Sequence, residues 1–176
     1  SSGYSVSPIP NIYTVTITDA LGCNEVYFVP ISEPNPISIS AVETPATCFG
    51  YADGSATMNV SGGTPPYFYG WSTGVSTTLT ESLLPAGFYD CQITDGNLCL
   101  AIGTITVTEP TEIVTATTGQ NISCNGICDG EVYTAPSGGV PPYTFLWNDL
   151  TNSTNDTVTG LCAGTYIDTI TDNTGC

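Results

Sequence analysis

Cysteines are the residues of this sequence whose type and spacing offer the clearest chemistry. No histidine accompanies them, so a mixed cysteine–histidine zinc site is excluded. The spacings Cys124-x3-Cys128 and Cys91-x7-Cys99 do not match a four-thiolate zinc knuckle either. Disulfide bonds in an oxidising compartment are the better interpretation. The eight candidates are Cys23, Cys48, Cys91, Cys99, Cys124, Cys128, Cys162 and Cys176.

Few side chains of this sequence could act in catalysis. The chain contains no Lys, Arg or His, and its 16 acidic residues give it a net charge of −16. Of the usual general acids and bases, only a carboxylate pair of the glycosidase kind is chemically available, and nothing in the sequence places two carboxylates in one cleft. We therefore assign no catalytic residue and expect no enzyme. The absence of cations also excludes nucleic acid and an anionic bilayer as partners.

Two further residue types suggest ligands or modification. Asp53 and Asp129, each followed by glycine, are weak calcium candidates, although Asx-turn capping explains them without a metal, so no cofactor is expected. Thr157 and Thr169 lie in Asp-Thr-aliphatic sequences that match a site for O-glycans. Thr157 is the better glycan candidate, because its segment is expected to be exposed.

An internal repeat organises the chain. The stretch Ser61–Trp71 returns as Ser137–Trp147, 76 residues later at every position. Glu-Pro pairs at 33–34 and 109–110 recur at the same distance and mark the joints. The sequence thus predicts the C-terminal part of a first repeat in residues 1–34, a complete second repeat in 35–110, and a third repeat lacking its last strand in 111–176.

The sequence of a complete repeat predicts six or seven short strands, because no stretch has helical periodicity. In the second repeat the strands are expected at 37–42, 55–60, 65–71, 76–83 (one or two), 87–94 and 101–108. This pattern predicts an all-β fold of tandem immunoglobulin-like sandwiches. Trp71 and Trp147 on the third strand, and Tyr89 and Tyr166 at tyrosine corners, are the expected core anchors. The alternative for the tryptophans is a platform that stacks on sugars.

The combined motif order resembles a known family. It runs Cys-x-Gly-x-x-Asp-Gly, Ser-Gly-Gly-x-Pro-Pro-Tyr-x-x-x-Trp, Ala-Gly-x-Tyr and Thr-Asp-x-x-Gly-Cys. This order is similar to the SprB-type repeat of long cell-surface adhesins of gliding Bacteroidetes. The resemblance implies export by the type IX secretion system and a role in adhesion or gliding. Leu98, in place of the glycine before Cys99, and the extra Cys91 depart from the pattern.

The expected topology limits the disulfide pairing. Cys128 and Cys162 fall in loops at the same end of a sandwich, so we predict that they pair. Cys48 falls at that end of its own repeat, whereas Cys99 and Cys176 fall at the opposite end. Three options stay open: a Cys48–Cys176 bond across the joint, bonds within each repeat (Cys48–Cys99 and Cys124–Cys176), and a bond between Cys48 and Cys91.

The sequence therefore favours a non-catalytic segment of an extracellular adhesin stalk or surface filament. Its expected partners are the neighbouring repeats of the same long chain, with surface polysaccharide and other copies in a filament as further candidates. An array of carbohydrate-binding modules in a secreted glycan-degrading protein is the alternative. A third possibility is self-assembly, because a repeat without its last strand leaves an edge open for strand donation.

Overall fold

The computed structural model describes residues 11–176, which form thirteen β-strands and no helix. The all-β prediction is confirmed. The strands are β1 (Asn11–Thr18), β2 (Asn24–Ile31), β3 (Ser38–Thr44), β4 (Gly54–Ser61), β5 (Phe68–Trp71), β6 (Thr80–Leu84), β7 (Gly87–Thr94), β8 (Leu100–Val107), β9 (Val114–Gln120), β10 (Gly130–Ser137), β11 (Thr144–Trp147), β12 (Thr157–Leu161) and β13 (Asp168–Thr171).

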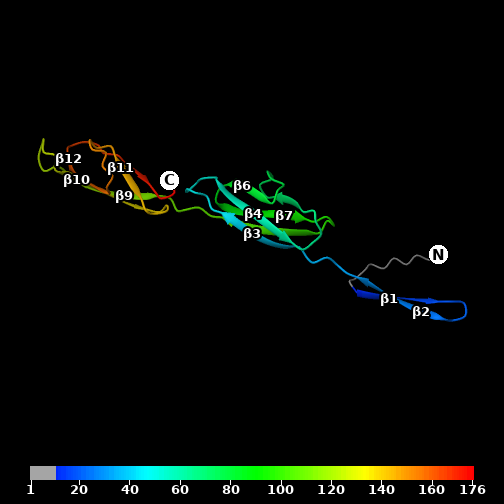
Figure 1. Cartoon of the computed structure of the whole chain (residues 1–176). Helices are drawn as coiled ribbons and strands as arrows, with labels where there is room; N and C mark the ends of the chain where they lie inside the picture. Colours follow the sequence, from blue (N-terminus) through cyan, green and yellow to red (C-terminus); the bar gives the residue numbers. More distant parts are fainter. Residues whose placement is uncertain (1–10) are drawn as a thin grey trace.

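The strands are arranged as three bodies in a row (Figure 1). The hairpin β1–β2 lies at one end, strands β3 to β8 form the middle body, and strands β9 to β13 form the far body. We call the second and third bodies unit 2 (residues 35–110) and unit 3 (residues 111–176). No helix in the described part of the chain is long and apolar enough to cross a bilayer.

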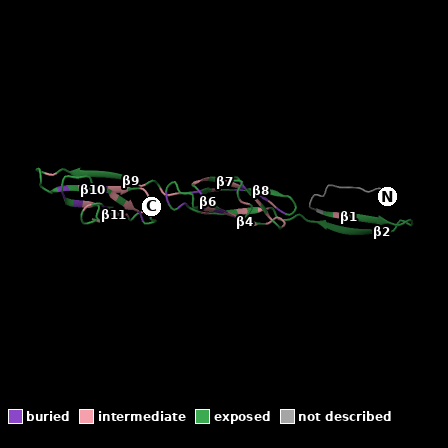
Figure 2. Ribbon diagram, turned by 90° about the horizontal axis from the view of Figure 1, so that it is seen from above, coloured by how far each residue is buried: buried purple, intermediate pink, exposed green. Residues whose placement is uncertain are grey.

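Unit 2 is a sandwich of two antiparallel three-stranded sheets, β3-β4-β6 and β5-β7-β8. Alternation along β4 turns Ala56 and Met58 into the space between the sheets, where both are fully buried. Figure 2 shows buried residues in the middle and far bodies, whereas β2 of the hairpin is exposed throughout. The core consists of Ala56, Met58, Trp71, Leu84, Cys91, Ile93 and Val107.

The strands of unit 2 differ from the expectation in two places. The stretch 76–83 yields a single strand, β6, which begins only at Thr80. The third strand begins at Phe68 instead of residue 65. Pro65 and Pro66 have no backbone N–H to give to a neighbouring strand, so ladder pairing begins only after them.

Unit 3 repeats this plan with one strand fewer. Its sheets are β12-β10-β9 and β11-β13, and Trp147, Val158 and Leu161 form its core. Within residues 111–176 no strand takes the place that β8 has in unit 2. This explains why β13 has four residues while its counterpart β7 has eight. Residues 87–90 of β7 pair only with β8, so their counterparts in unit 3 have no ladder partner.

A groove runs along unit 3 where β8 lies in unit 2. We call it the β9–β13 groove. Its walls come from β9, β10, β11 and β13, and all seven residues of β9 are exposed. The residues that line its middle include Thr115, Thr117, Thr134, Trp147, Asp168 and Ile170.

The N-terminal hairpin has the register of the last two strands of unit 2. Asn11 faces Ile31 as Gly87 faces Val107, and Thr18 faces Asn24 as Thr94 faces Leu100. β1 and β2 are thus the counterparts of β7 and β8, each displaced by one repeat. All eight residues of β2 are exposed.

Candidate functional site: the bridged joint between units 2 and 3

The loop between β3 and β4 presents Cys48 at the end of unit 2 that faces unit 3. The Asp53 carboxylate closes this loop by accepting hydrogen bonds from the backbone N–H of Thr47 (2.9 Å) and from its hydroxyl. These bonds lower the pKa of Asp53, the one from the hydroxyl most. Glu109 holds the loop tip from the other side, since its Oε2 accepts a bond from the Gly50 N–H at 2.6 Å.

A second loop presents Cys176 from unit 3. The buried Asp172 carboxylate accepts hydrogen bonds from the backbone N–H groups of Val140 (2.8 Å), Thr174 (2.9 Å) and Cys176 (3.0 Å). Burial raises the pKa of Asp172, but these bonds outweigh it and lower the pKa to about 2. The Asp side chain therefore fixes the position of the cysteine four residues further on.

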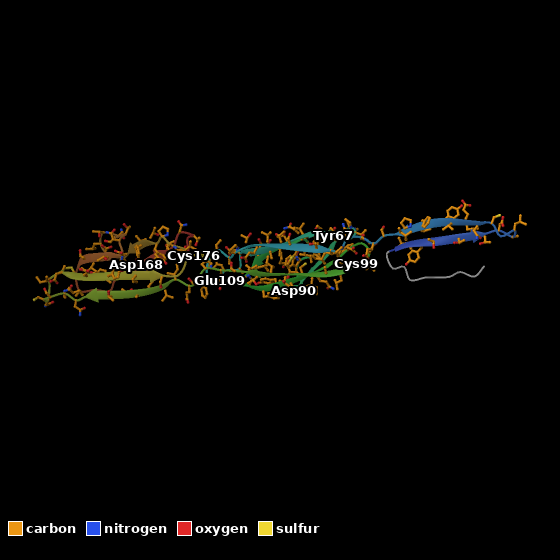
Figure 3. The ribbon with its side chains drawn as sticks, turned by 90° about the horizontal axis from the view of Figure 1, so that it is seen from below. Tyr67, Asp90, Cys99, Glu109, Asp168 and Cys176 are labelled. Atoms are coloured by element: carbon orange, nitrogen blue, oxygen red, sulfur yellow. A yellow bond between two sulfur atoms is a disulfide. The ribbon has the colours of Figure 1, made fainter. Side chains whose placement is uncertain are left out.

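Cys48 and Cys176 form a disulfide bond across the joint, with their Cα atoms 5.7 Å apart and 128 positions apart in the sequence. The Thr174 hydroxyl also donates to the Thr47 carbonyl at 3.4 Å. Glu109 and Cys176 lie together where units 2 and 3 meet (Figure 3). A shallow pocket beside the bond is lined by residues of both units, among them Phe49, Tyr51, Pro110 and Ile113.

The other pairings considered for Cys48 do not occur. Cys99 is exposed and unbonded, and it lies at the opposite end of unit 2 from the joint (Figure 3). Cys91 is a free thiol inside the core, on β7 opposite Trp71, and burial raises its pKa. Cys23 and Cys124 are also free and exposed.

A second disulfide lies within unit 3. It joins Cys128 to Cys162, with Cα atoms 3.9 Å apart and a sequence separation of 34. Unit 2 has Ala52 and Pro85 at these positions. The bond ties the loop before β10 to the loop after β12, both at the outer end of unit 3 (Figure 1).

The four predicted core anchors differ in how deeply their side chains are buried. Trp71 and Trp147 are 4% and 2% exposed, and their indole N–H groups donate to the carbonyls of Thr78 (2.8 Å) and Asn155 (2.9 Å). The half-buried Tyr89 and Tyr166 donate their hydroxyl hydrogens to the carbonyls four residues earlier, at 2.9 and 3.0 Å. These bonds have the geometry of a tyrosine corner. Neither indole presents a face on which a sugar ring can stack.

The metal and glycan candidates have specific surroundings. Asp129 accepts a bond from the Ser123 N–H at 2.8 Å, as Asp53 does from Thr47. Among the described residues no three His, Cys, Asp or Glu side chains cluster in a way that could hold a metal ion. Residues 154–156, directly before Thr157, are exposed. Thr157 is half-buried on β12 because it pairs with β10, whereas Thr169 on β13 is exposed.

Two functional residues escaped the sequence analysis. The Thr-Asp-x-x-Gly-Cys motif was used only for the family resemblance, and the role of its aspartate as a clamp on the cysteine was not recognised. The spacing of four between Asp19 and Cys23, Asp95 and Cys99, and Asp172 and Cys176 is the signal that could have found it. Glu109 was recognised as a joint marker, but its bond to Gly50 joins residues 59 positions apart and has no local signature.

This geometry defines a class of protein: tandem immunoglobulin-like β-sandwich repeats with a disulfide across a joint. Residues 40–76 and 116–152 match the family model of the SprB repeat. The chain therefore carries two SprB repeats, which begin at corresponding positions of units 2 and 3. A comparison with curated proteins found no match.

Proposed function

We propose that this chain is a non-catalytic segment of an extracellular adhesin stalk or surface filament of a Bacteroidetes cell. In this role it is exported by type IX secretion and serves adhesion or gliding. The repeats act mechanically, because each unit contacts mainly its neighbours and holds the next one at a distance from the cell.

One observation carries the proposal: two SprB repeats lie end to end, and the Cys48–Cys176 bond ties them across their joint. A bond between units contributes little to the fold of either unit, but it limits how far one unit can bend against the next. Such a constraint is useful in a spacer under load. Disulfides also fit an oxidising, extracellular compartment.

The proposal also accounts for the surface chemistry. With no Lys or Arg, the chain offers no cleavage site to trypsin-like proteases, and its net charge of −16 disfavours aggregation. The buried tryptophans favour a spacer over an array of carbohydrate-binding modules, because those modules need exposed aromatic faces.

Surface labelling tests the location and the role. Antibodies raised against residues 11–176 are applied to intact cells that produce the parent protein. We expect labelling without permeabilisation and at a distance from the envelope in electron micrographs. Deletion of the repeats should weaken attachment of the cells to a surface. Labelling that requires permeabilisation, or deletion without any effect on attachment, would contradict the proposal.

A further inference from the structure

The Cys48–Cys176 bond closes a covalent ring that contains most of units 2 and 3. Its two cysteines are 128 positions apart, so residues 49–175 lie inside this disulfide ring. The ring includes every strand from β4 to β13. Of the described strands of units 2 and 3, only β3 lies outside it, because β3 comes before Cys48. The ring is defined by the two bonded cysteines, whatever residues come before or after them.

Tension along the chain therefore has a covalent route that avoids both cores. A pull that enters ahead of Cys48 passes along β3, crosses the two sulfur atoms and leaves at Cys176 or beyond it. The residues of the disulfide ring lie parallel to this route and cannot be drawn out while the bond holds. The bond is covalent, whereas the sheets and cores are held by hydrogen bonds and apolar contacts that are individually weak.

β3 is the sandwich strand on this route, and it is already extended. It runs from the hairpin side of unit 2 toward unit 3 (Figure 1). A strand rises about 3.3 Å per residue, close to the limit of about 3.6 Å for a stretched chain, so tension can lengthen it very little. All seven residues of β3 pair with β4. Because the pull acts on the two ends of β3 in opposite directions, it does not shear β3 against β4.

The connection from β3 to the bond is short and held in place. Only residues 45–47 separate the end of β3 from Cys48. Ala46 is buried, and its N–H donates to the Thr108 carbonyl at 2.9 Å. The Thr47 N–H donates to Asp53, also at 2.9 Å. Little slack therefore lies between the strand and the sulfur atoms, and tension reaches the disulfide without first drawing residues out of unit 2.

We propose that the Cys48–Cys176 bond is the load-bearing element between these two repeats, and that it keeps units 2 and 3 folded under tension that would otherwise unfold them. The bond is also a release, because a thiol that cleaves it transfers the load to both units. The biological use of this route rests on the proposed function, since a stalk or filament is what would be pulled. The route itself belongs to the chain and can be tested on the isolated molecule.

Single-molecule force measurements on the whole chain test the route. The chain is held by tags at its two termini, its disulfides are verified by mass spectrometry, and it is compared with Cys48→Ser/Cys176→Ser. In this variant we expect units 2 and 3 to unfold in separate steps, because each has its own core. At the same forces the bonded chain should show neither step, and the residues ahead of Cys48 should lengthen alike in both chains. An unfolding step of either unit in the bonded chain would overturn the proposal.

Reduction under constant force tests whether the units stay folded behind the bond. A dithiothreitol thiolate attacks one sulfur of the Cys48–Cys176 bond, which forms a mixed disulfide and releases the other cysteine as a thiolate. The second dithiothreitol thiol then displaces the first cysteine, so that two protein thiols and one cyclic oxidised dithiothreitol result. The load now falls on units 2 and 3. We expect two successive unfolding steps, with the waiting times found for Cys48→Ser/Cys176→Ser.

The opposite result has a distinct signature. If the units had already unfolded behind the bond, reduction would give one immediate step. Its length would be about 310–340 Å, because the Cys128–Cys162 bond withholds 34 of the 128 positions between Cys48 and Cys176. Such a step would refute the claim that the bond keeps the units folded.

The Cys128–Cys162 bond supplies a matched control, because it lies within the disulfide ring. In Cys128→Ser/Cys162→Ser the joint bond is intact, so the oxidised chain should resist tension as the unmodified chain does, although unit 3 is less stable. Resistance that falls with the stability of unit 3 would mean that unit 3 carries load, and the proposal would be wrong. A failed force test leaves the surface labelling of the proposed function unaffected, and failed labelling leaves the load route in place.

Discussion

Leu98 and Leu83 have left-handed backbone conformations that bulky residues rarely adopt. Their φ angles are +66° and +58°. Unit 3 has Gly175 and Gly160 at these positions, with φ +88° and +74°. The first position lies in a loop and the second lies within a strand, β6 in unit 2 and β12 in unit 3. The backbone therefore has the same conformation at both positions in the two units, and in unit 2 a leucine side chain disfavours that conformation.

Replacement of either leucine by glycine should stabilise unit 2. Both side chains are mostly exposed, 81% for Leu98 and 75% for Leu83, so little packing is lost. We expect Leu98→Gly and Leu83→Gly each to raise the free energy of unfolding by about 0.5–1 kcal/mol, the relief of left-handed strain less the extra chain entropy of glycine. Urea titration measures the change. The reverse substitution Gly175→Leu should destabilise unit 3, and unchanged midpoints in all three variants would contradict this account.

Asp172 should make the stability of unit 3 depend on acid pH. Its folded-state pKa of about 2 lies below the ordinary 3.8, so the ionised form is favoured by folding. The resulting stabilisation is present above about pH 4 and is lost as the pH falls toward 2. We expect Asp172→Asn to lower the melting temperature at pH 7 and to flatten its decline below pH 4. Calorimetry from pH 2 to 7 measures both effects.

A matched control separates this effect from the general relief of charge repulsion on acidification. Glu131 is exposed on β10, so Glu131→Gln removes one negative charge without touching the Asp172 loop. Its pH profile should run parallel to that of the unmodified chain. A profile of Asp172→Asn that is parallel as well would show that the clamp on Cys176 contributes nothing.

The free cysteines should differ in reactivity. Cys91 is fully buried and burial raises its pKa, so little thiolate is accessible to a reagent. We expect iodoacetamide at neutral pH to modify Cys23, Cys99 and Cys124 in the folded chain and to modify Cys91 only after urea is added. Peptide mass spectrometry identifies the sites. Rapid modification of Cys91 in the folded chain would place it outside the core.

At the scale of elements, strand alternation was sufficient to predict most of unit 2. The period of two along β4 and β7 marks which residues face the core, and the 76-residue repeat carries the same assignment to unit 3. The length of β13 was not predictable from its own residues, because residues 164–167 resemble residues 87–90 and differ only in having no β8 beside them.

The candidate site was predictable in outline only. Knowledge of which end of a sandwich holds each cysteine limits the partners of Cys48, but the choice between Cys176 and Cys99 depends on how consecutive units abut. That arrangement depends on contacts between residues far apart in the sequence, such as Thr174 of unit 3 and Thr47 of unit 2. Cys91 illustrates a second difficulty. A cysteine that is buried in the core as a free thiol cannot be told from a disulfide-forming cysteine by its residue type, because the two differ only in burial.

A strand supplied in the same chain should complete unit 3. We consider an extension after Cys176 with the sequence of residues 24–34, and a matched one with that of residues 100–110. Either should fill the β9–β13 groove, and the first should stabilise unit 3 more, because Tyr27 occupies space that Gly103 leaves empty next to Thr134. We expect the first extension to raise the free energy of unfolding of unit 3 by about 1–2 kcal/mol, which corresponds to a rise of about 5–10 °C in melting temperature. A shift of equal size with both would mean that the groove does not select its central residue.

At the scale of the whole molecule, the two disulfides have different tasks, because one lies across a joint and the other lies within a unit. The Cys48–Cys176 bond connects units that each have their own core, so its loss should leave both cores intact. The Cys128–Cys162 bond closes a loop within unit 3 and restricts its unfolded state.

Paired substitutions should separate these tasks. In Cys48→Ser/Cys176→Ser we expect unchanged melting of unit 2, and small-angle X-ray scattering should reveal a wider range of angles between units 2 and 3. In Cys128→Ser/Cys162→Ser we expect unit 3 to lose about 3 kcal/mol of stability, while the angle at the joint stays fixed in the folded chain. Each variant is the control for the other. Because a stalk transmits force only if its joints resist bending, a joint that stays equally rigid without the Cys48–Cys176 bond would mean that other contacts between the two units, such as that of Thr174 with Thr47, set its geometry.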